Sequence, residues 1–140
     1  MKVLWMLSIA LAGCIGEPPA EPIEPTFASI EEHLLRSRCT GPCHSGGEEN
    51  AAGHLDLSVD PWTALVEAPA RSRQCGDEDR VLVVPGRPDE SLLWKKLEAR
   101  AAGHAPPCGV GMPPPPDRPA VPDEARAAVR SWIETGALAD

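Results

Sequence analysis

Large side chains are scarce in this chain of 140 residues, which contains four Trp, one Phe and no Tyr. A core built from so few aromatic residues is thin, so a domain of this size needs something more to fill or staple it. The chain also carries five Cys, an unusual number for a protein of a reducing compartment. The sequence therefore predicts a small domain that depends on the chemistry of its cysteines.

The first cysteine follows an apolar N-terminal segment. Residues 3–12 are apolar except for Ser8, and the run is too short to span a bilayer, which is typical of a signal peptide. The next residues, Leu11-Ala12-Gly13-Cys14, resemble the bacterial lipobox. This resemblance implies cleavage after residue 13 and a lipid thioether on Cys14. An ordinary cleavable signal peptide with a free cysteine nearby is the alternative.

Three segments are expected along the chain. Residues 1–13 form the lipoprotein signal peptide, residues 14–25 a lipidated, Pro- and Glu-rich tether, and residues 26–140 the folded domain. Residue 15 is Ile and not Asp, which favours attachment to the outer membrane, so we expect a lipid-anchored protein of the cell envelope. The formal charge of −8 disfavours nucleic acid as a partner.

Apolar residues recur at helical spacing in four places, and no segment alternates as a strand does. Helices are expected after Thr26, from Pro61, over residues 88–99 and over residues 122–135. Residues 113–116 are four consecutive prolines, which form a rigid loop. We therefore predict an all-α fold with about four short helices and long irregular connections.

The chemistry is concentrated in Cys39-Thr40-Gly41-Pro42-Cys43-His44, directly after the first predicted helix. Two close cysteines followed by a histidine are typical of c-type haem attachment. Each sulfur adds to one vinyl group of the porphyrin, and the adjacent imidazole binds the iron from one face. The second imidazole nitrogen then normally donates to a backbone carbonyl. Covalently bound haem also supplies the bulk that an aromatic-poor core lacks.

The spacing departs from the usual C-x-x-C-H, because three residues separate Cys39 from Cys43. Gly41 can let the extra residue bulge outward. Otherwise only Cys43 binds the haem and Cys39 remains free. Two further alternatives stay open, a disulfide between Cys39 and Cys43 and a zinc site at Cys and His ligands.

A second iron ligand is expected on the opposite face, and Met112 is the only Met outside the signal peptide. Together these features resemble small monohaem cytochrome c domains, especially the lipoprotein-type domains grouped with planctomycete cytochromes. The resemblance implies a cytochrome c-like fold around one covalent haem c. It also implies thioethers at Cys39 and Cys43, His44 and Met112 as iron ligands, and Trp132 as an aromatic contact. The segments that carry it are CTGPCHSG (39–46), AAGHLDLS (51–58), VVPGRPDESLLWKKL (83–97), GMPPPP (111–116) and ARAAVRSWIETGA (125–137).

Three other histidines compete with Met112 for the second iron position, namely His33, His54 and His104. The two remaining cysteines, Cys75 and Cys108, are expected to form a disulfide in an oxidising compartment. Such a bond would also anchor the segment that carries Met112.

The expected function is electron transfer by a membrane-tethered c-type cytochrome, with no catalytic residues and no small-molecule substrate. The acidic balance suits a redox partner with a basic face. Two alternatives come from other classes. One is a haem-free, disulfide-stabilised envelope lipoprotein that serves as a binding or structural module, and the other is a haem sensor or peroxidase with an open sixth iron site.

Overall fold

The structure, a computed structural model, describes residues 21–41 and 43–140 and is helical without strands in that part of the chain. The expected all-α class is thereby confirmed. The predicted signal peptide and Cys14 lie outside the described residues, and so does most of the tether. Within the two described ranges, no helix is long and apolar enough to cross a bilayer.

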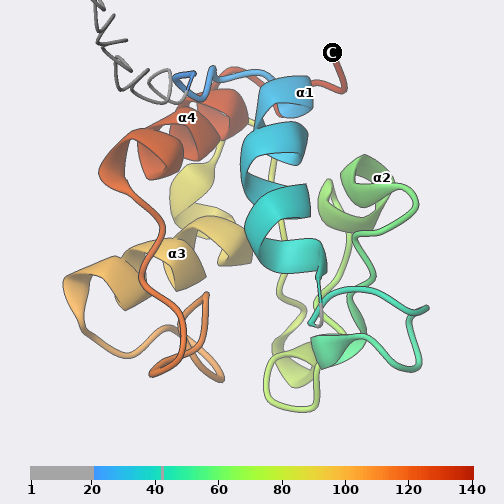
Figure 1. The fold of residues 1–140 in the computed structure, drawn as a ribbon. Coiled ribbons are helices and arrows are strands. Elements are labelled where there is room, and N and C mark those ends of the chain that lie inside the picture. Colours follow the sequence, from blue (N-terminus) through green and yellow to red (C-terminus); the bar gives the residue numbers. More distant parts are fainter. Residues whose placement is uncertain (1–20, 42) are drawn as a thin grey trace, which may run out of the picture.

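The first helix starts where the sequence predicts, because the Thr26 hydroxyl accepts a hydrogen bond from the Ser29 amide at 3.3 Å. Helix α1 (Phe27–Ile30) runs directly into η1 (Glu31–Thr40), a π-helical stretch (Figure 1). The Thr40 hydroxyl donates to the Leu35 carbonyl at 2.8 Å, five residues back. The sequence predicted a helix here without its π geometry, which usually occurs as single turns near functional sites. This stretch ends at the cysteine motif.

The second helix, α2 (Pro61–Leu65), is short and begins with proline as predicted. A carboxylate oxygen of Asp60 accepts from the Thr63 amide at 3.1 Å and so caps this helix. Single 3-10 turns occur at η2 (Ala52–His54) and η3 (Gly76–Glu78).

The prediction of one continuous helix over residues 88–99 is wrong for its first turn. A 3-10 turn, η4 (Pro88–Glu90), is separated from α3 (Leu92–Ala102) by an extended residue, Ser91. The fully buried Ser91 hydroxyl accepts from the Val84 amide at 2.8 Å and donates to the Arg87 carbonyl at 2.9 Å. These tertiary bonds to the preceding segment replace the continuous helix.

The last helix, α4 (Asp123–Glu134), carries acidic residues in its first turn and a buried apolar stripe. It packs against α1 and α3 (Figure 1). The Trp132 ring lies 5.4 Å from the Phe27 ring, centroid to centroid, in the middle of the main core. The last helix thus packs directly on the first.

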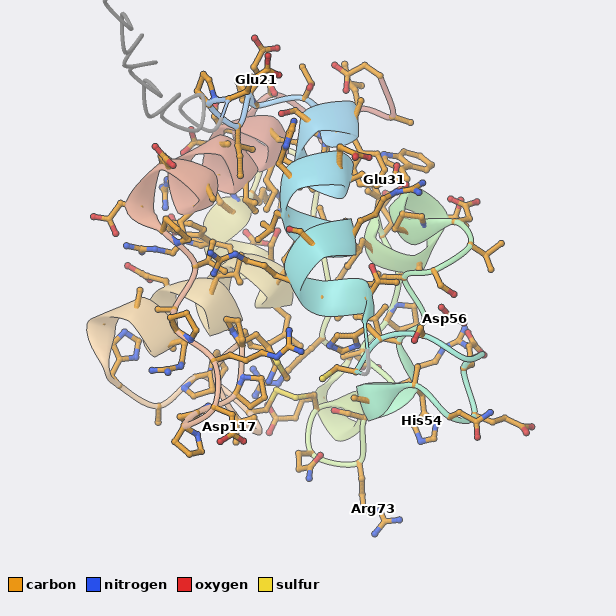
Figure 2. The ribbon with its side chains drawn as sticks, viewed as in Figure 1. Glu21, Glu31, His54, Asp56, Arg73 and Asp117 are labelled. Atoms are coloured by element: carbon orange, nitrogen blue, oxygen red, sulfur yellow. A yellow bond between two sulfur atoms is a disulfide. The ribbon has the colours of Figure 1, made fainter. Side chains whose placement is uncertain are left out.

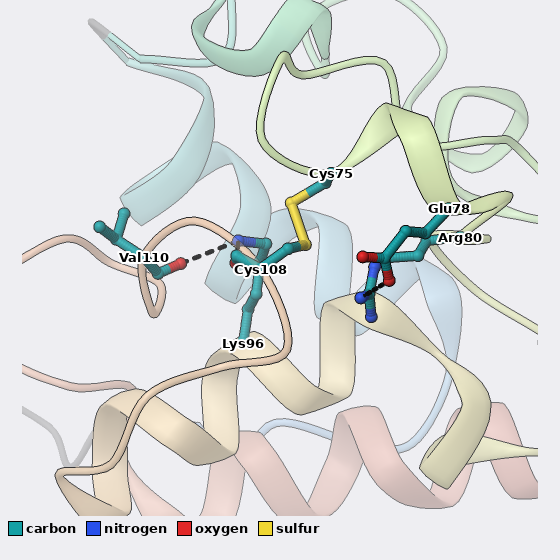
Figure 3. Close-up of a disulfide and its surroundings, with 6 residues drawn as sticks. All are labelled: Cys75, Glu78, Arg80, Lys96, Cys108 and Val110. Carbon is teal, nitrogen blue, oxygen red and sulfur yellow. Dashed lines mark hydrogen bonds and ion pairs between the residues drawn. A yellow bond between two sulfur atoms is a disulfide. The ribbon is translucent and has the colours of Figure 1, made fainter.

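The expected disulfide between Cys75 and Cys108 is confirmed, with the two Cα atoms 5.4 Å apart (Figure 3). It belongs to a small second apolar cluster built around Ala70, Cys75 and Leu92. The bond joins the loop before η3 to the loop after α3, so it staples a part of the domain that the main core does not reach.

Trp132→Ala should lower the free energy of unfolding by about 3 to 5 kcal/mol, because it empties the centre of the core. It also removes the indole N–H that donates to the Leu138 carbonyl at 2.8 Å. Urea unfolding followed by circular dichroism measures the loss. Leu138→Ala is the control, since that side chain is 61% exposed and should change stability by less than about 0.5 kcal/mol. Equal effects of the two substitutions would contradict this account of the core.

Replacing both Cys75 and Cys108 by Ala should cost about 3 to 4 kcal/mol of stability, from the chain entropy of an unfolded loop of roughly 33 residues. Chemical unfolding of the double variant and the oxidised wild type, at the same pH, gives the difference. A loss below about 1 kcal/mol would show that the bond adds little to the fold.

Candidate functional site

The predicted haem-binding residues meet at one cavity of about 560 Å³. Cys39, Cys43, His44 and Met112 all line it, although Met112 is 68 residues beyond His44 in the sequence. Most of the wall is aliphatic. Six of the residues that form it are Leu35, Leu55, Leu57, Leu82, Leu93 and Leu97.

Cys39 lies in the last turn of η1 and is partly buried. Burial raises the pKa of its thiol to about 11, and the opposing charges of Arg118 and Arg38 only partly offset this. Cys39 is thus a neutral thiol at neutral pH, and thiolate reactivity there requires an added base or catalyst.

The chain turns sharply between the two cysteines, and Gly41 is exposed with open space beside its Cα. The His44 amide comes back to the carbonyls of Cys39 and Thr40, at 3.2 and 3.1 Å. This closure brings Cys43 to the same cavity as Cys39 in spite of the additional residue in the motif. Both cysteines are free thiols here, which does not support the Cys39–Cys43 disulfide alternative.

The His44 ring is held in one tautomer. Its Nδ1 lies 3.0 Å from the Leu55 carbonyl, and because a carbonyl only accepts, the ring proton is on Nδ1. Burial lowers the pKa of His44, while the bond to Leu55 raises it in part. The imidazole is therefore neutral at pH 7 and keeps its Nε2 lone pair for a metal.

Backbone hydrogen bonds around His44 fix the position of the Leu55 carbonyl. The Leu57 amide donates to the His44 carbonyl at 2.9 Å, and the Ala52 amide donates to the Cys43 carbonyl at 2.7 Å. Residues 52–57 thus pack alongside the cysteine motif on the side of His44.

Met112 reaches the cavity from the loop that follows α3. Its amide donates to the Lys96 carbonyl at 3.0 Å, which joins the loop to α3. A Cβ at Gly111 would lie 3.0 to 3.1 Å from backbone and Cβ atoms of Arg100, so only glycine allows this approach. The Arg100 Nε also donates to the Pro113 carbonyl at 3.0 Å. Met112 is thus held on both sides by contacts with α3.

Two of the three competing histidines do not line this cavity. His33 is exposed on η1, and His104 is exposed beyond α3. His54 does line it but is exposed at its edge, with Nδ1 3.1 Å from the Glu48 carbonyl (Figure 2). His54 belongs to the same segment as Leu55, which holds His44, so it lies on the His44 side of the site.

The structure does not bring Trp132 to the cavity. This residue is 1% exposed, contacts Phe27 and is absent from the cavity wall. The predicted cofactor contact of Trp132 is replaced by a role in the core, because the last helix meets the first near Phe27 and not near the cysteines.

Two arginines that sequence reasoning missed also line the cavity. Arg118 donates through Nη1 to the Arg38 carbonyl at 2.9 Å. Neither guanidinium joins an ion pair within the described part of the chain, although six other arginines do. The same two residues border a smaller cavity of about 310 Å³. Arg38 could have been noticed beside Cys39, whereas nothing in the sequence places Arg118 there.

The donor set at the cavity is the His44 imidazole, the Met112 thioether and two thiols, with the exposed His54 imidazole at its edge. Among the residues that the structure describes, no group of three or more His, Cys, Asp or Glu side chains is arranged to hold a metal ion. This arrangement does not support the zinc alternative, which needs about four such ligands close together.

Comparison with models of known protein families, with curated proteins and with solved structures found no match to this chain.

Proposed function

We propose that this protein is a monohaem c-type cytochrome that transfers electrons and is tethered to a membrane by lipid on Cys14. Cys39 and Cys43 would bind the haem covalently, with His44 and Met112 as the two iron ligands. The observation that carries the proposal is the convergence of these four residues, from distant parts of the sequence, on one cavity.

The cavity has the size and chemistry that a haem requires. Its volume of about 560 Å³ lies within the range of roughly 300–1,000 Å³ that is usual for cofactor sites. The aliphatic wall suits a flat apolar ring. Arg38 and Arg118 supply two unpaired positive charges, and haem carries two propionate carboxylates.

A bound haem supplies an iron that carries one electron by alternating between the ferric and ferrous states. The protein's contribution is to hold the ligands and exclude water. His44 is oriented by the Leu55 carbonyl, which also increases the basicity of the imidazole. A thioether ligand from Met112 favours the reduced state and so raises the potential.

Electron transfer is favoured over a sensor or peroxidase role because both His44 and Met112 line the cavity and would each supply a ligand to the iron. With both ligands supplied by the protein, no position on the iron would remain for a substrate. The formal charge of −8 favours a partner with a basic face, which would associate through electrostatic steering. The partner is therefore expected to be another redox protein.

Protein produced with haem-maturation machinery should gain the mass of one haem, retained under denaturing conditions. Denaturing mass spectrometry together with the visible spectrum of the reduced protein tests this. The Cys39→Ala/Cys43→Ala double variant should lose covalent haem, and each single variant reports whether the remaining thiol forms a thioether on its own. The control is the Cys75→Ala/Cys108→Ala double variant, which should keep its haem. Colourless protein with the polypeptide mass alone would favour the haem-free lipoprotein.

Met112→Ala should remove the sixth ligand and lower the reduction potential, within the span of roughly 0.8 V that axial ligands set. The absorption spectrum and a potentiometric titration measure the two effects. His104→Ala is the control, since that residue is exposed and outside the cavity. An unchanged spectrum in Met112→Ala, with a changed one in His54→Ala, would assign the ligand to His54 instead.

A further inference from the structure

We propose that Lys96 is a positioning residue, which sets the place of Met112 in the cavity by binding the loop of residues 108–113 to α3. This inference rests on the proposed function, because it concerns the side chain that would be the sixth iron ligand.

Lys96 makes three hydrogen bonds to this loop, at alternate residues. Its ammonium donates to the Cys108 carbonyl at 2.8 Å and to the Val110 carbonyl at 2.9 Å (Figure 3). Its own backbone carbonyl accepts from the Met112 amide at 3.0 Å. Lys96 therefore binds Met112 and also the residues that precede it in the loop.

The loop is shaped around the ammonium group. Gly109 has a φ of +59°, and a Cβ there would lie 3.3 Å from the Lys96 Nζ and 3.7 Å from the Cys75 sulfur. Any other residue at this position would be strained by the left-handed backbone conformation, and its side chain would lie too close to the Lys96 ammonium. The close fit shows that the chain at residues 108–110 wraps over the end of the Lys96 side chain.

Besides Lys96, contacts on either side of Met112 hold the loop, and the close approach of Gly111 to Arg100 is one of them. The disulfide fixes Cys108, four residues before Met112, and Arg100 binds the carbonyl of Pro113, one residue after it. Residues 108–113 have no regular secondary structure, and Val110 between them is 51% exposed. Charge-assisted bonds from a partly buried ammonium are strong enough to order such a segment.

The chain offers a matched control at the next residue. Lys95 is also partly buried on α3, and no side-chain hydrogen bond or ion pair of Lys95 occurs among the described residues. Lys95→Met and Lys96→Met make the same chemical change on the same helix, and only the second removes the donors to the loop.

The experiment compares both variants with the wild type as holoproteins. Hydrogen exchange is followed at the Met112 amide, which donates to the Lys96 carbonyl, together with the ferric absorption band of the methionine–iron bond and the reduction potential. In Lys96→Met, exchange should accelerate about tenfold or more, as expected for the loss of hydrogen bonds to a charged group. The methionine–iron band should weaken and the potential should move toward that of Met112→Ala. Lys95→Met should match the wild type.

The outcomes separate this inference from the proposed function. If Met112→Ala leaves the spectrum unchanged, Met112 does not bind the iron, and its assignment as the sixth ligand in the proposed function is wrong. If Met112→Ala changes the spectrum but Lys96→Met keeps the wild-type band and potential, Lys96 is not a positioning residue, whatever its effect on exchange. Lys96→Gln retains one amide donor and should give a smaller change. It replaces Lys96→Met as the deciding variant if the latter does not fold.

Discussion

The site depends on the attachment of residues 108–113 to α3. Without that attachment, nothing nearby in the sequence would bring Met112 to the same cavity as His44, which is 68 residues earlier in the chain. Two kinds of interaction produce it, the hydrogen bonds from Lys96 and the close approach of Gly111 to Arg100, while the disulfide ties Cys108 to the loop before η3. Each acts on a different part of the loop, and none of them needs a large apolar core.

The part of the cavity wall formed by the cysteine motif is built by different means. There the π-helical end of η1 places Cys39, and backbone hydrogen bonds from residues 52–57 hold Cys43 and His44. The imidazole is desolvated and bonded through Nδ1 to Leu55, so it is neutral and oriented. An oriented imidazole and a loop held by a disulfide and by hydrogen bonds thus contribute to the wall of one cavity.

The main core borders this cavity, since Leu35, Leu57 and Leu97 belong to both, but its aromatic pair lies away from the cavity wall. Phe27 and Trp132 form its centre, and this explains why the tryptophan of the last helix stabilises the domain and does not touch the site. A chain with few aromatic residues uses its largest side chain where three helices meet. The region around the cysteine motif combines contact of Cys39 with this core and backbone hydrogen bonds from residues 52–57.

Much of this arrangement could be predicted from the order of residues, because the signals are local. The Thr26 cap, the proline at the start of α2 and the acidic first turn of α4 act within a few residues, and the pairing of Cys75 with Cys108 follows from the count of cysteines. The contents of the candidate site were predicted in the same way, from the spacing of Cys39, Cys43 and His44 and from the single remaining methionine. Only the tertiary structure decided the break at Ser91, the role of Trp132 and the positions of Arg118 and Lys96. These depend on which carbonyls and helices come together in the folded chain, and such long-range contacts leave no periodic pattern in the sequence.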